Sequence, residues 1–268
     1  MSTELTRLVL TRAASGAVRL SGGGGVLRAV LLERGPDWAR VSLMPQRMLL
    51  LDGDDVALKV EVGSGLRLEL SETGGTVAHD MRGGRARWRT AFHLRAGAAL
   101  THHTWPWVSC AGSDVERSTE VRLGTGARAV LRETLVLGRH GELPGRLRAR
   151  TRVLREEAEV PVEVLVEELC SDDLDATFSP TGHRVLDQVL CLGPCVLPAA
   201  ESGGPSLAPG QTSGPAPTST WQAVHPTRLD LASGDHLWRA LATDAHHAAG
   251  ELDRIFETLD AAQRPIVT

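Results

Sequence analysis

Apolar and polar residues alternate along most of the chain up to about residue 200, and a glycine interrupts the alternation in the same way at three places. In each copy, two apolar residues one position apart precede the glycine and two more follow it; the copies span residues 60–68, 92–100 and 121–129. Alternation predicts a strand with one buried face, and glycine allows a tight bend at low cost. Because the copies recur about every 30 residues, they predict stacked β-coils that bury their apolar faces against one another. A β-sandwich whose hairpins share the same turn chemistry is the alternative at this point.

The strand pattern extends on both sides of the repeat. Residues 18–20 and 26–32 flank a glycine-rich turn, and residues 147–153 and 160–169 largely alternate polar with apolar. Residues 201–220 are mostly Gly, Pro, Ser or Thr, a composition that buries too little apolar area to offset its ordering entropy. We therefore expect one domain over residues 1–268, with a β core over about residues 5–200 and a disordered loop at 201–220.

The period of the apolar residues changes near the end of the chain. Over residues 237–259 they recur mostly at three- and four-residue steps, which predicts a helix that begins near Ser233 or Asp235 and ends near residue 262. These residues form an apolar stripe along one face of the helix, and such a stripe either covers the core or docks a partner. The predicted fold class is all-β, of β-helical stacked-coil topology, with a small C-terminal α-helical element. The stripe includes Leu237, Leu241, Leu252 and Phe256.

Composition and charge argue against several classes of partner. The chain has 29 basic and 33 acidic residues, a formal net charge of −4, which leaves no basic surplus to neutralise nucleic-acid phosphates. No apolar run approaches the roughly 18–20 residues of a membrane helix, and the N-terminus lacks the apolar segment of a secretory signal. We expect a soluble, cytoplasmic protein that binds neither nucleic acid nor membrane. We expect its four cysteines to be free thiols, because their spacing fits neither a disulfide scaffold nor a paired zinc site.

Two sequence patterns suggest a binding site, one for a dinucleotide and one for a metal ion, but neither has the structural context that its site needs. Gly124, Gly126 and Ala129 have the spacing of a dinucleotide fingerprint, but the residues after them alternate as a strand, where the fingerprint needs a helix. His102 and His103 are neighbours on a predicted strand and so point to opposite faces, which prevents both from binding one ion. We expect no catalytic residues and no tightly bound cofactor.

Glu133 is the one residue whose predicted position is unusual. On the strand that begins at Arg128, alternation places Glu133 on the same face as apolar neighbours such as Leu131. A buried carboxylate is costly unless it is paired, protonated or hydrated. Two interpretations are open: a structural ion pair, with Arg139 or Arg150 as the partner, or a polar passage through the β core.

Four segments of the chain together resemble one protein family: residues 50–65, 73–80, 105–113 and 132–139. The last of them matches the Glu-x-Leu-x-x-Gly-Arg signature of that family most closely, and the order and spacing of the four together are specific. Departures from the family pattern include Asp52 in place of a glycine, and Val77 and His79 in place of lysine and tyrosine. The family that these segments resemble is the UreD (UreH) family of urease accessory proteins.

The resemblance implies a non-catalytic scaffold of helical β-topology with defined partners. Such a scaffold binds UreF, recruits the GTPase UreG through UreF, docks on apo-urease and offers Ni(II) an internal route to the active site. A route must hold an ion well enough to admit it and loosely enough to release it, which isolated carboxylate, carbonyl and imidazole groups do better than a closed four-ligand site.

Candidate residues follow from this resemblance. Glu133, Asp114 and His103 are expected to line the nickel route, with Ni(II) only in transit. Leu237, Leu241, Leu252 and Phe256 are expected to contribute to the contact with UreF. The alternative function is a β-solenoid interaction module without metal. A β-helical carbohydrate-active enzyme is disfavoured because the chain has no tyrosine and three phenylalanines for sugar stacking.

Overall fold

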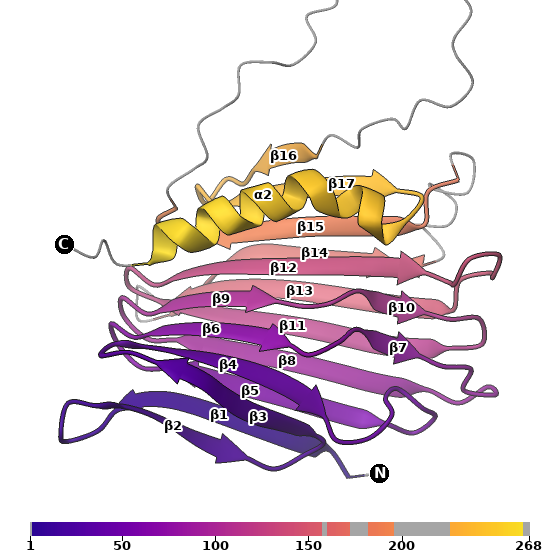
Figure 1. The fold of residues 1–268 in the computed structure, drawn as a ribbon. Helices are drawn as coiled ribbons and strands as arrows, with labels where there is room; N and C mark the ends of the chain where they lie inside the picture. The colour runs from indigo at the N-terminus through magenta and orange to yellow at the C-terminus, as the bar shows by residue number, and fades with distance from the viewer. Residues whose placement is uncertain (1, 157–159, 172–181, 196–225, 265–268) are drawn as a thin grey trace, which may run out of the picture.

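Two β-sheets packed face to face form the body of the protein in a computed structural model, which describes residues 2–156, 160–171, 182–195 and 226–264 (Figure 1). Sheet A has, in spatial order, β14 (Val162–Cys170), β13 (Arg146–Glu156), β11 (Asp114–Gly124), β8 (Ala86–Leu94), β5 (Asp55–Val62), β1 (Glu4–Arg12) and β2 (Val18–Gly23). Sheet B has β16 (Thr227–Asp230), β17 (His236–Ala242), β15 (Val185–Leu192), β12 (Arg128–Leu137), β9 (Ala99–His103), β6 (Arg67–Glu72), β4 (Trp38–Pro45) and β3 (Leu27–Arg34). Two short strands complete sheet B, β7 (Thr76–Ala78) and β10 (Trp107–Ser109).

The middle of the chain winds between the two sheets as a stack of coils. From β5 to β13 it passes repeatedly from sheet A to sheet B and back, and the strands of successive coils pair in parallel. Each predicted glycine lies at a bend between the sheets: Gly65, Gly97 and Gly126 have φ values of 65°, 66° and 67°, a region that favours glycine. The predicted stacked β-coil fold is confirmed, and β12, not a helix, follows Gly126.

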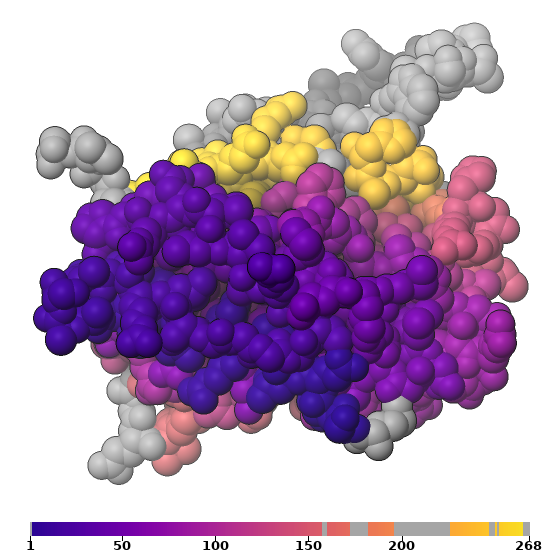
Figure 2. All heavy atoms as spheres, turned by 60° about the horizontal axis from the view of Figure 1, so that its bottom comes forward, coloured from indigo at the N-terminus to yellow at the C-terminus, as the bar shows by residue number. Residues whose placement is uncertain are grey.

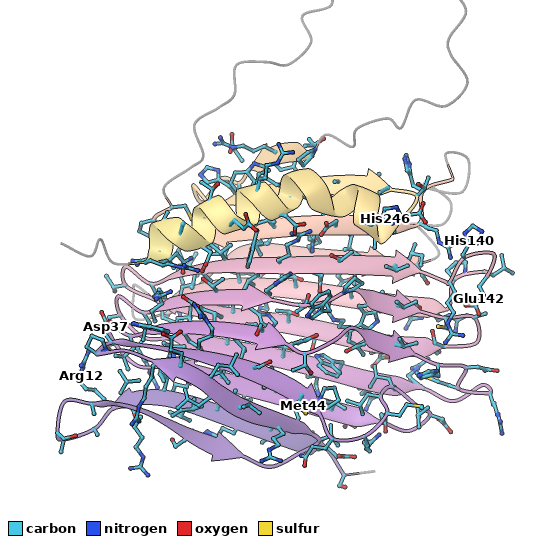
Figure 3. All side chains as sticks on the ribbon, viewed as in Figure 1. Arg12, Asp37, Met44, His140, Glu142 and His246 are labelled. Carbon is cyan, nitrogen blue, oxygen red and sulfur yellow. A yellow bond between two sulfur atoms is a disulfide. The ribbon has the colours of Figure 1, made fainter. Side chains whose placement is uncertain are left out.

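The same architecture extends to both ends of the stack. The predicted strands around the glycine-rich turn are β2 and β3, and those near residues 147–169 are β13 and β14. Viewed from below, the side chains of the N-terminal strands, coloured indigo and violet, form a closely packed surface with α2 beyond them in yellow (Figure 2). Arg12 and Asp37 mark one end of the strands, and His140 and Glu142 in the β12–β13 connection mark the other (Figure 3).

The C-terminal helix is shorter than predicted. Residues 236–242 form strand β17 and pair with β15, and the helix α2 spans Ala245–Gln263. Asp235, expected to cap a helix, instead stabilises a turn: it accepts hydrogen bonds from the amide of Gly193 and the hydroxyl of Ser233, at 2.7 and 2.6 Å. The prediction of one helical stripe from Leu237 to Leu259 is therefore wrong, because its first part belongs to sheet B.

One cysteine prediction is also wrong. Cys191 and Cys195 form a disulfide, because the turn after β15 brings their Cα atoms to 6.7 Å. Cys110 and Cys170 are free, as expected. The predicted loop at 201–220 lies outside the described residues. Within the described part of the chain, no helix is both long and apolar enough to cross a membrane.

Candidate functional site

A polar layer crosses the apolar space between the two sheets. The strand registers place Thr90, Thr119, Thr151 and Glu167 side by side on sheet A. On sheet B they place Glu133, Gln188 and Arg239 side by side. Apolar rows lie on both sides of this layer, because the buried residues two positions before and after it on β12 are Leu131 and Leu135. A continuous polar row inside a β core is unusual, since burying polar groups costs free energy unless they are paired.

Charged and amide side chains connect the sheets across this layer. Arg117 of β11 forms a short ion pair with Glu133. Gln188 Nε2 donates to Glu133 Oε2 at 3.0 Å, and Gln188 Oε1 accepts from Arg239 at 2.6 Å. Arg239 in turn donates to Glu167 at 2.6 Å, which closes the chain of contacts between β17 and β14. Opposite charges thus alternate through the interior, from the middle of the stack to its C-terminal end.

A small cavity of about 40 Å³ lies in this layer. It is large enough for a few water molecules. Its lining includes Thr119, Thr151, Glu133 and Gln188. The hydroxyls of Thr119 and Thr151 have no hydrogen-bonding partner among the described residues, so they are available to water or to an ion. The layer stops toward the N-terminal end, where the buried Leu43 lies beside Glu72.

Burial perturbs the titratable groups of the layer. Burial raises the pKa of Glu72 to about 7, although the Arg117 charge opposes the change. Burial, together with the charges of Arg117 and His103, lowers the pKa of His102 to about 3, so its imidazole is neutral. Burial also lowers the pKa of Arg117 to about 10, against the charge of Glu72, which leaves the guanidinium protonated at neutral pH. Within the described part of the chain, the Nε2 of His102 and the Nε of Arg117 are buried without a hydrogen-bonding partner.

The predicted position of Glu133 is confirmed, but its predicted partners are not. Its side chain is 16% exposed and lies between the sheets. The partner is Arg117, whereas Arg150 pairs with Glu168 and Arg139 with Glu142. Sequence reasoning missed Arg117 although the alternation of β11 places it on the inward face with the buried Val115 and Val121.

Asp114 and His103 do not lie in the layer with Glu133. Asp114 begins β11 on the outer face of sheet A, where its carboxylate pairs with Arg85 at 3.1 Å and Arg146 at 3.6 Å. Its neighbour Val115 takes the buried position, so strand alternation turns Asp114 outward. His103 is on the outer face of sheet B, beneath α2, with its ring 5.1 Å from that of Phe256. Its neighbour His102 is the histidine that faces the interior.

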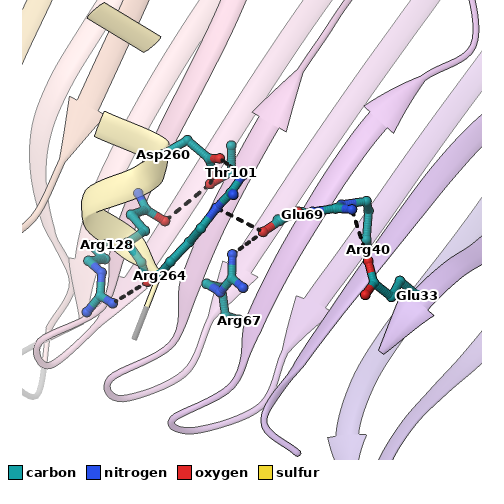
Figure 4. Close-up of polar contacts among 9 residues, drawn as sticks. Glu33, Arg40, Arg67, Glu69, Thr101, Arg128, Asp260 and Arg264 are labelled. Atoms are coloured by element: carbon teal, nitrogen blue, oxygen red, sulfur yellow. Dashed lines mark hydrogen bonds and ion pairs between the residues drawn. The ribbon is translucent and has the colours of Figure 1, made fainter. Parts of the chain in front are cut away.

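The surroundings of His103 are a polar network that holds the end of α2. Asp260 accepts from Thr101 at 2.7 Å and from Arg264 at 2.7 Å, and Arg40 donates to Glu69 at 2.7 Å (Figure 4). Burial and the nearby Arg132 charge lower the pKa of His103. Among the described residues no group of three or more His, Cys, Asp or Glu side chains is placed to hold a metal ion.

Three of the four apolar candidates for partner contact are buried within the chain, and Leu241 is half-buried. Leu252 and Phe256 are 0% and 8% exposed and pack on the outer face of sheet B against Trp238. Leu237 is 5% exposed in the core between the sheets, and Leu241 packs against that core. Leu252 and Phe256 are therefore not placed for direct contact with another protein while α2 remains docked.

The fold and its interior define a class: a stacked β-coil protein with a charged layer between its sheets. In a comparison with known proteins, the family model for the UreD urease accessory protein matches residues 35–266. The chain is 38% identical to urease accessory protein UreD 1 of Streptomyces griseus over 82% of this chain and 77% of that protein. It is 33% identical to UreD of Frankia casuarinae, over 67% of this chain and 54% of that protein. The chain belongs to the UreD family of urease accessory proteins.

Proposed function

We propose that this protein is a urease maturation factor of the cytoplasm that has no turnover of its own. It binds UreF and, through UreF, the GTPase UreG; it docks on apo-urease and conducts Ni(II) toward the urease active site. Membership of a urease accessory family supports the maturation role. The partners and the nickel route are the finer part of the proposal.

The observation that carries the nickel route is the charged layer between the sheets. Glu133 brings a carboxylate into an interior whose other oxygen donors include the hydroxyls of Thr119 and Thr151. Carboxylate and hydroxyl oxygens are weak ligands for Ni(II) compared with imidazole and thiolate. They suit an ion that passes through and is released, and the interior His102, with a neutral ring, can contribute the nitrogen ligand.

The ion pair of Glu133 favours a second candidate function. Because Arg117 and Gln188 satisfy both oxygens of the carboxylate, the layer can also be read as a purely structural network. The protein is then a β-solenoid interaction module without metal. Equilibrium nickel binding separates the two functions: in a pull-down both bind the urease subunits, but the module binds no nickel.

The test replaces Glu133 and measures nickel delivery. We expect Glu133→Ala to lower the nickel content and activity of matured urease, while the complex of the chain with UreF and UreG still co-purifies. Glu116→Ala is the matched control, because it removes a carboxylate that pairs with Arg85 and Arg87 on the outer face of sheet A. An unchanged nickel content in the Glu133 variant, with the variant folded, contradicts the route.

A further inference from the structure

Arg117 places a positive charge where an incoming cation would need a carboxylate. Its guanidinium forms the ion pair with Glu133 and also lies over the ring of Trp107, with the Cζ atom 4.9 Å from the ring centroid. The side chain is only 10% exposed. A divalent cation and a guanidinium cannot share one carboxylate without strong repulsion, because charge interactions are little screened in the interior.

The other interior arginine does not have the same freedom. Arg239 is held by two acceptors, Gln188 and Glu167. Among the described residues, Arg117 has one carboxylate partner, and its Nε is buried with no hydrogen-bonding partner. Ser71 pairs with His103, and His103 pairs with Arg132. Glu72 and Glu133 are the next residues on their strands, so the register places them two strands apart on sheet B, where a second carboxylate is available to the guanidinium when it leaves Glu133. Arg117 is thus less tightly held than Arg239.

We propose that Arg117 is a gate for cations in the interior layer: its guanidinium occupies Glu133 at rest and must move toward Glu72 before a divalent cation can take its place. The inference rests on the proposed nickel route and adds its regulation. While the ion pair between Arg117 and Glu133 is intact, the interior layer is neutral there and binds free cations weakly. Any contact that shifts β11 relative to β12 releases the carboxylate, so an ion is admitted only in the complex that is ready to receive it.

The test is equilibrium binding of Ni(II) to the purified full-length chain, measured by competition with a chromophoric chelator at pH 7.5. Arg117→Gln is expected to raise the affinity at least about tenfold, because the repulsion that it removes is worth more than one factor of ten in a weakly screened site. The double variant Arg117→Gln, Glu133→Gln is expected to lose this gain. Arg89→Gln is the matched control, since Arg89 pairs with Asp55 on the outer face of the same sheet. It should leave the affinity unchanged.

Two further variants complete the test: one retains the positive charge at position 117, and the other leaves Arg117 in place and changes the ring beneath it. Arg117→Lys keeps the positive charge and should keep the low affinity. If Arg117→Gln does not fold, Trp107→Phe gives the test instead: a smaller ring holds the guanidinium less strongly, and the affinity should rise about threefold. Wild-type affinity in a folded Arg117→Gln or Trp107→Phe variant overturns the gate.

The gate and the nickel route fail in different ways. If Glu133→Ala lowers nickel delivery to urease but Arg117→Gln binds Ni(II) no more tightly than the wild type, the route stands and the gate is wrong. If Glu133→Ala leaves delivery unchanged, the route itself is wrong, and the gate falls with it.

Discussion

Glu72 is a carboxyl group that the fold keeps partly protonated at neutral pH. It ends β6 and faces the charged layer, where burial raises its pKa to about 7. In the unfolded chain the same group titrates near 4.3. A carboxyl whose pKa is higher in the folded state destabilises the fold as the pH rises, because the unfolded chain releases the proton first. The cost accumulates between about pH 4.3 and pH 7 and is constant above that.

Replacement of Glu72 with glutamine should remove this cost. We expect Glu72→Gln to gain stability relative to the wild type as the pH rises from 4.5 to 7, by up to about 3 kcal/mol. Urea unfolding of both proteins at pH 5 and pH 8 measures the difference. Glu168→Gln, on an exposed side chain of β14, controls for the loss of a carboxylate. A difference between wild type and Glu72→Gln that is the same at both pH values contradicts the burial of this group.

At the scale of elements, α2 is held on sheet B by apolar packing and by buried charge. Arg132 of β12 is 3% exposed and donates to Asp187 of β15 at 2.7 Å, and it also pairs with Asp253 of α2. Thr134 donates a further hydrogen bond to Asp187 at 2.9 Å. The helix therefore caps the outer face of sheet B, and its exposed side includes Arg254, Glu257 and Ala261.

Substitutions on the two sides of α2 should have different effects on UreF binding. Ala261→Arg adds a large side chain on the exposed side without touching the core, and we expect it to weaken co-purification with UreF while the melting temperature stays within a few degrees of wild type. Leu252→Asp puts a charge into a fully buried position. We expect it to lower stability by about 3 kcal/mol or more, so any loss of UreF that it causes reports unfolding of the helix.

Co-purification of the Ala261→Arg variant with UreF shows whether UreF contacts α2. A folded Ala261→Arg variant that binds UreF as the wild type does removes α2 from the contact. The circular dichroism spectrum of each variant decides whether the fold is intact.

The sequence predicted single strands well and the contacts between strands poorly. Alternation correctly separated His102 from His103 and turned Glu133 inward, because the two faces of a strand differ by one residue. It could not show that Arg117 lies opposite Glu133, because that contact depends on how the two sheets pack. Residues 237–241 misled the helix prediction, since Leu237 and Leu241 fit both a helical and an alternating period.

At the scale of the whole molecule, the stack of coils turns one polar residue per strand into a continuous layer. Parallel pairing in register places Thr90, Thr119 and Thr151 in one row. The row is a property of the stack, because no single coil contains more than one of these threonines. For the proposed nickel route, the row supplies oxygen atoms although no metal-binding cluster is found among the described residues.

Removal of the hydroxyls from this row tests the path without changing charge or shape. Thr119→Val with Thr151→Val replaces two hydroxyls by methyl groups, and we expect matured urease to contain at least about twofold less nickel, because an ion in the layer loses two oxygen contacts. The fold should be unharmed, since neither hydroxyl has a hydrogen-bonding partner among the described residues. Val153→Leu is the matched control: it adds bulk to the apolar row beside the layer, on the same strand as Thr151. Equal nickel content in all three proteins would show that the ion does not pass between the sheets.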